Sequence, residues 1–124
     1  MAAVDAAAHL GAERQQKSAP SVDSTLLGKR LEICCNYDLL PPLVGKEPRW
    51  CAGEVVLISD GTNIAIPDRP RAKYPKGEAV MMRWDADVAR EEPVTTSSAR
   101  LLVTKWNPKG EQTDGGWRFD PDCL

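Results

Sequence analysis

Short stretches of alternating polar and apolar residues recur along the chain, separated by prolines and glycines. In residues 29–35, Leu31, Ile33 and Cys35 fall on one side of an extended chain, and Arg30, Glu32 and Cys34 fall on the other. A period of two is typical of a half-buried strand. The 124 residues include 10 prolines and 9 glycines, which favour many turns over long helices. The pattern predicts an all-β fold.

Four further stretches are predicted to be strands. Residues 50–58 contain Gly53 and then an unbroken apolar run, as expected for a strand with two apolar faces in a small, strongly curved barrel; Gly53 would supply a bulge or bend. Residues 78–84 alternate again. The fourth strand is expected within residues 95–106, centred on residues 100–104, and the fifth is expected to span residues 117–120. Five short antiparallel strands without a convincing helix predict a small barrel or sandwich.

The first part of the chain differs in composition from the rest. Residues 1–24 are rich in Ala, Gln and Ser and have no repeating apolar face, so we expect a flexible leader there and a folded domain in residues 25–124. Residues 1–10 lack the basic and apolar regions of a secretory signal. We therefore expect an intracellular protein with reduced thiols, in the nucleus rather than the cytoplasm, and without a membrane partner.

The cysteines do not form a metal-binding pattern. Zinc ligands usually come in pairs two to four residues apart. Here Cys34 and Cys35 are adjacent, whereas Cys51 and Cys123 stand alone. We interpret all four as ordinary, partly buried thiols, and we expect neither a metal nor a cofactor.

The sequence offers little support for catalysis. The only histidine, His9, lies in the expected leader, where it could not activate a cysteine. Ser97 and Ser98 lack the glycine frame of a nucleophile elbow. The carboxylates of Asp85 and Asp87 are two residues apart and are interpreted as turn formers. We therefore expect a binding protein rather than an enzyme.

One short segment is strongly basic, although the net charge of the chain is −2. Its four cations have no acid between them, and Tyr74 lies among them. In single-strand binders, cations contact phosphates while an aromatic ring stacks on a base. A solvated loop is the other interpretation of such a charge run. The segment comprises Arg69, Arg71, Lys73, Tyr74 and Lys76.

Large aromatic side chains are expected to fill much of the core. Trp50 is predicted to point into it, because tryptophan buries a large apolar area. Trp106 and Trp117 are expected to stack on each other across the last two strands. If one of them were exposed, it would extend an aromatic binding face.

Three stretches resemble the first three strands of Tudor and chromo-barrel domains, which belong to the SH3-like group. They are residues 28–33 (GKRLEI), 50–56 (WCAGEVV) and 80–85 (VMMRWD). The resemblance covers residues 28–102 and implies a strongly bent antiparallel barrel. The tryptophan-rich residues 105–121 match no element of these domains.

The resemblance also implies a function and a site. Family members typically bind methylated lysine or arginine in an aromatic cage, through attraction between the cation and the ring faces. Tyr37 and Trp84 match two cage walls, Asp85 or Asp87 would add a carboxylate, and Cys51 occupies a position that is usually aromatic. We expect a module that binds a basic or methylated peptide of a protein partner. The alternatives are a nucleic-acid-binding barrel and a structural docking module of a larger assembly.

Overall fold

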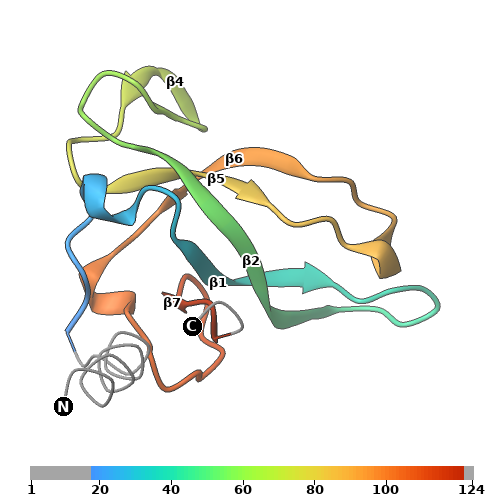
Figure 1. The fold of residues 1–124 in the computed structure, drawn as a ribbon. Helices are drawn as coiled ribbons and strands as arrows, with labels where there is room; N and C mark the ends of the chain where they lie inside the picture. The colour runs from blue at the N-terminus through green and yellow to red at the C-terminus, as the bar shows by residue number, and fades with distance from the viewer. Residues whose placement is uncertain (1–17, 122–124) are drawn as a thin grey trace, which may run out of the picture.

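The structure is a computed structural model that describes residues 18–121 (Figure 1). No α-helix occurs in this part of the chain, so the predicted all-β fold is confirmed. Three 3-10 helices are present: η1 (Ser24–Leu26), η2 (Val88–Arg90) and η3 (Val103–Lys105). The strands are β1 (Arg30–Asp38), β2 (Lys46–Ile58), β3 (Ala65–Ile66), β4 (Arg69–Lys73), β5 (Ala79–Trp84), β6 (Thr95–Arg100) and β7 (Trp117–Phe119).

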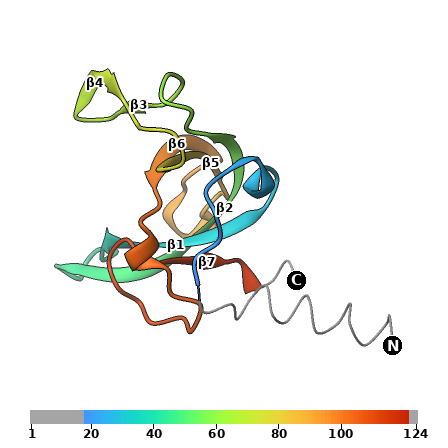
Figure 2. The same cartoon turned by 90° about the vertical axis from the view of Figure 1, so that its left-hand side faces the viewer.

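Five of these strands form one curved antiparallel sheet in the order β6-β5-β2-β1-β7. β3 and β4 form a separate hairpin that projects from the sheet (Figure 1). Figure 2 shows how the sheet curls around its inner face. Within residues 18–121 no strand pairing joins the two edge strands, β6 and β7.

β2 changes its pairing partner around Gly53. The first part of β2 pairs with β1 as far as Glu54, and the second part pairs with β5 from Gly53 onward, with a register shift between Val55 and Leu57. A Cβ atom at Gly53 would lie 2.7 Å from the Arg83 carbonyl oxygen. Only glycine therefore allows the backbones of β2 and β5 to approach this closely. The irregularity that the sequence suggested at Gly53 lies further along the strand, between Val55 and Leu57.

The core lies on the inner face of the curved sheet. Trp117 is fully buried, and the Trp106 ring meets it edge to face, with ring centroids 4.8 Å apart. The expected contact between these two tryptophans is therefore present, although Trp106 follows η3 and joins Trp117 through a single bridge rather than through a strand. The buried core comprises Leu26, Leu31, Ile33, Val55, Val80, Met82, Leu101, Trp117 and Phe119.

The prediction that Trp50 points into the core is wrong. Trp50 pairs with Cys34, whereas the next residue of β2, Cys51, pairs with the core residue Ile33. Since successive side chains of a strand point to opposite faces, the Trp50 ring lies on the outer face. There the guanidinium of Arg118 covers it, 4.1 Å from the ring centroid.

The fourth strand, β6, lies within the predicted residues 95–106, but its centre is displaced. The centre was expected at residues 100–104, whereas β6 ends at Arg100 and the chain then turns into η3. Leu101 is buried in the core, whereas Val103 is 70% exposed. The aliphatic residues after Arg100 therefore mark the point where the chain leaves the sheet.

The packed part of the chain begins before residue 25. Ala19 and Val22, assigned to the leader by sequence, pack against the core. Residues 1–17, which hold most of the expected leader and His9, lie outside the described residues, as does Cys123. Within residues 18–121, no helix has the length and apolar character needed to cross a membrane.

We predict that Gly53→Ala destabilises the domain by about 1–3 kcal/mol, because the added methyl group meets the β5 backbone rather than a movable side chain. Urea unfolding followed by tryptophan fluorescence measures the change. Thr96→Ala, at an exposed position of β6, is the control and should change stability by less than about 0.5 kcal/mol. Equal stability of the two variants would show that β2 does not need glycine at this position.

Candidate functional site

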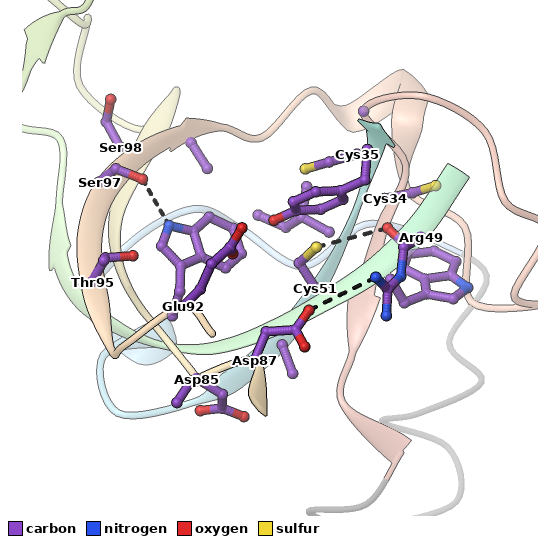
Figure 3. A pocket seen from close by; sticks show the side chains of 18 of the residues that line it. Cys34, Cys35, Arg49, Cys51, Asp85, Asp87, Glu92, Thr95, Ser97 and Ser98 are labelled. Carbon is purple, nitrogen blue, oxygen red and sulfur yellow. Dashed lines mark hydrogen bonds and ion pairs between the residues drawn. The ribbon is translucent and has the colours of Figure 1, made fainter. Parts of the chain in front are cut away.

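A pocket of about 690 Å³ lies at one end of the curved sheet (Figure 3). Its walls come from β1, β2, β5, β6 and the connection between β5 and β6. All five residues predicted for the ligand site line it, namely Tyr37, Cys51, Trp84, Asp85 and Asp87.

Strand register explains why the predicted residues meet. Gly53 pairs with Trp84 and lies two residues after Cys51, so these positions share the inner face of the sheet. Tyr37 lies four residues after Ile33, the partner of Cys51, and points to the same face. A period of two along each strand therefore brings the thiol and both rings to one side.

Sequence reasoning missed several other lining residues. Cys35 and Arg49 each lie two residues before a predicted site residue and pair with each other across β1 and β2, so the alternation contained the signal for both. Glu92 and Asp114 come from connections between strands. No local pattern indicates where such connections fold.

The rings of Tyr37 and Trp84 differ in whether an arginine of the chain already lies over them. The Trp84 indole nitrogen donates a hydrogen bond to the Ser97 hydroxyl oxygen, 2.7 Å away, which fixes the ring against β6. The Tyr37 ring already carries the guanidinium of Arg90, 4.7 Å from its centroid, and that of Arg49, 5.9 Å away. Trp84 is therefore the ring of the pocket that carries no internal cation within the described part of the chain.

The predicted carboxylates also have internal partners. Asp85 forms an ion pair with Arg30. An Asp87 carboxylate oxygen lies 3.7 Å from Arg49 Nη1 and 3.8 Å from Arg90 Nε. Asp87 also caps η2 by accepting a hydrogen bond from the Arg90 amide, which agrees with its expected role in a turn.

Two other acids leave the pocket negatively charged. Glu92 and Asp114 both line it, and neither forms an ion pair within residues 18–121. Of the four acids in the lining, Asp85 and Asp87 are paired with arginines of the chain, and the lining residue Arg100 is paired with Glu78. Glu92 and Asp114 therefore carry the charge that is not compensated within residues 18–121. The pocket therefore suits a cation better than an anion.

Cys51 is the most acidic thiol of the pocket. It accepts hydrogen bonds from the Cys35 thiol and the Tyr37 hydroxyl, and the Arg49 guanidinium lies nearby; together they lower the pKa of Cys51 to about 7, against the opposing effects of burial and Asp87. The pKa values of Cys35 and Tyr37 are raised, chiefly because each donates to Cys51. Figure 3 shows Cys35 and Cys51 at the same wall.

The basic segment lies apart from the pocket. Arg69, Arg71 and Lys73 alternate along β4, so they share one face of the β3–β4 hairpin, where they are exposed. Lys76 is also exposed, whereas Tyr74 is half-buried. None of the five lines the pocket. The basic segment thus lies largely in β4 of a short hairpin, which gathers three of the cations.

Comparison with family models, curated proteins and solved structures finds no match to this chain. The resemblance to Tudor and chromo-barrel domains therefore rests on its three short motifs and stays a prediction. In the described part of the chain, no group of three or more His, Cys, Asp or Glu residues is arranged to hold a metal ion.

We predict that the Cys51 thiol titrates near pH 7, so that the pocket gains one negative charge as the pH rises through this value. The Cβ chemical shift of ¹³C-labelled cysteine measures the midpoint. Tyr37→Phe removes one donor to the thiolate and should raise the midpoint. Tyr74→Phe, outside the pocket, should leave it unchanged. A Cys51 midpoint near 9 in the unaltered chain would contradict the arrangement of donors.

Proposed function

We propose that this chain is a non-catalytic binding module that takes a basic or methylated side chain of a peptide into the pocket. The observation that carries the proposal is the composition of one concave surface. The rings of Tyr37 and Trp84 line it together with Glu92 and Asp114, two carboxylates without an ion-pair partner in residues 18–121.

Rings and carboxylates contribute differently to cation binding. The carboxylates attract a positive charge over a distance and favour a basic segment over an acidic one. The ring face attracts the cation at contact, by about 0.5–1 kcal/mol at an exposed site and about 2 kcal/mol when water is excluded. A methylated ammonium sheds water easily, so it gains more from the ring than a free ammonium does.

The chain's own arginine supports this chemistry. The side chain of Arg90 is 10% exposed and lies over the Tyr37 ring beside the Asp87 carboxylate. Its Nη2 also donates to the Asp38 carbonyl oxygen at the end of β1. The Tyr37 ring and the Asp87 carboxylate therefore hold a cation of the chain itself, by the same combination of groups that is proposed for the ligand. Trp84 provides the ring that remains for a ligand.

We predict that a basic peptide carrying trimethyl-lysine shifts the Trp84 indole resonance in ¹H–¹⁵N NMR spectra. The fully buried Trp117 should move little and serves as the internal control. Trp84→Ala should abolish the other shifts at the pocket. Weaker binding of the unmethylated peptide would show a preference for methylation.

A neutral ligand separates charge from shape in this experiment. In the neutral analogue, carbon replaces the ammonium nitrogen, so the size is kept while the cation–ring attraction is lost. Equal binding of the charged and neutral peptides, or an unmoved Trp84 resonance at millimolar peptide, would contradict the proposal.

The β3–β4 hairpin supports a second candidate function, the binding of single-stranded nucleic acid. Arg69, Arg71 and Lys73 share one exposed face, and none of them forms an ion pair within the described residues. Phosphates would take the place of the missing acidic partners.

We predict for this candidate that oligonucleotide affinity falls with salt, with a log–log slope of about 0.7 per phosphate contact. Fluorescence anisotropy of a labelled single strand measures it. Replacing Arg69, Arg71 and Lys73 by Gln should remove both the affinity and the slope, while Trp84→Ala should change neither. Affinity that survives the triple substitution would exclude the hairpin as the site.

A further inference from the structure

Strand β6 forms one edge of the curved sheet, and no strand pairs with its outer side within residues 18–121. β6 pairs with β5 over all six of its residues without a register shift. It contains neither proline nor lysine, which natural proteins use, together with bulges, to protect the edges of their sheets. The other edge strand, β7, has only three residues. β6 is therefore the longer edge, and it carries none of these protections.

The register shows which backbone groups of β6 point away from β5. The Leu101 amide donates to the Glu78 carbonyl oxygen, 3.0 Å away, and this pair continues the register of the two strands. Hydrogen-bonded and non-hydrogen-bonded pairs alternate in an antiparallel ladder, so the backbone groups of Thr96, Ser98 and Arg100 point outward. In the described part of the chain, no backbone hydrogen bond from outside the β5–β6 ladder reaches these three residues.

The pocket of about 690 Å³ extends along this free edge. A pocket confined to the inner face would meet only Ser97 and its alternate neighbours, because Ser97 pairs with the core residue Met82. Ser98 and Arg100, which belong to the other set, line the pocket as well. Figure 3 shows Ser97 and Ser98 on one side of the pocket and Cys35 of β1 on the other. The pocket is therefore a groove beside the free backbone groups of β6.

The charges along this groove favour a basic occupant. Glu92 comes from the connection before β6, and Asp114 comes from the connection between η3 and β7. Neither forms an ion pair within residues 18–121, whereas Arg100, the one charged residue of β6, is paired with Glu78. Such carboxylates attract a basic segment and disfavour an acidic one. An extended basic peptide therefore matches both the free backbone and the charges.

We propose that an extended basic peptide adds to β6 as a further strand of the sheet. This inference rests on the proposed function and specifies how the peptide is held. The peptide backbone exchanges hydrogen bonds with Thr96, Ser98 and Arg100. Because side chains alternate between the two faces of a strand, every second side chain enters the pocket that Trp84 and Glu92 line. The main-chain bonds supply affinity, and the pocket selects the basic residue.

Alternate N-methylation of the peptide tests the pairing. A strand that pairs along one edge donates through every second amide. Two versions of the trimethyl-lysine peptide carry N-methyl groups on one or the other alternate set of residues, and both are titrated into the ¹⁵N-labelled chain. We expect one set to abolish binding and the other to preserve it. With the unmodified peptide bound, the amides of Thr96, Ser98 and Arg100 should exchange with solvent about tenfold more slowly or less.

Two substitutions at one position separate the backbone of β6 from its side chains. Ser98→Pro removes an outward amide and keeps the pairing with β5, since an edge strand tolerates proline where the missing N–H faces solvent. Ser98→Ala, the matched control, keeps the amide. We expect the proline variant to bind the peptide about tenfold more weakly, because a backbone hydrogen bond is lost and its neighbours are disturbed. The alanine variant should bind like the unaltered chain.

The buried Trp117 indole resonance reports whether each variant remains folded. The N-methylated peptides ask the same question of the unaltered chain, so the test does not depend on the folding of the proline variant. Equal effects of the two N-methyl sets would overturn the inference. Slow exchange of the β6 amides without peptide, increasing with protein concentration, would also overturn it, because the strand that adds would then belong to a second copy of this chain.

A single residue, the N-acetyl amide of trimethyl-lysine, separates this inference from the proposed function. It can enter the pocket but cannot form a strand. If it shifts the Trp84 resonance and binds as tightly as the peptide, the cation site stands and the β6 edge is not used. If the peptide protects the β6 amides while Trp84 does not move, the added strand stands and the cation site does not. A peptide that does neither at millimolar concentration would overturn both.

Discussion

The close approach of two backbones at Gly53 determines the shape on which the other features depend. β2 serves two neighbours in succession, β1 and then β5, and it changes partner where a side chain would meet the Arg83 carbonyl oxygen. Through this pairing, the Trp84 end of β5 and the strand β1 lie on either side of the middle of β2. Tyr37 and Trp84 share a pocket because β2 pairs with both of their strands.

Charge compensation within the chain determines what that pocket offers to a ligand. Asp85 and Asp87 hold arginines of the chain itself, and Tyr37 carries one of them on its ring. The pocket groups that hold no arginine of the chain are the Trp84 ring and the carboxylates of Glu92 and Asp114. If the pocket binds a cation as proposed, the chain's own arginines already occupy part of it, which argues for a compact ligand such as one side chain.

Alternation along the strands made much of this predictable from sequence. Residues two apart on an extended chain share a face, and the strands around Ile33 and Met82 show this clearly. The same rule separates Trp50 from Cys51, and applying it would have placed Trp50 outside. The prediction failed because side-chain size was given more weight than position.

Other features depended on long-range folding that no local pattern encodes. The aliphatic residues after Arg100 look like a strand, but the sheet ends there because Leu101 turns into the core. Glu92 and Asp114 reach the pocket from connections far apart in the sequence. Arg90 lies on the Tyr37 ring only because the β5–β6 connection folds back toward β1.

The adjacent cysteines of β1 show what a strand does to neighbours in sequence. Cys34 and Cys35 look like one chemical unit, yet the strand turns their side chains to opposite faces of the sheet, where Cys34 is 1% exposed and Cys35 is half-buried. Strand β1 therefore gives two neighbouring thiols different exposure to solvent. A reagent in the pocket meets the exposed parts of Cys35 and Cys51, whereas burial shields the Cys34 thiol.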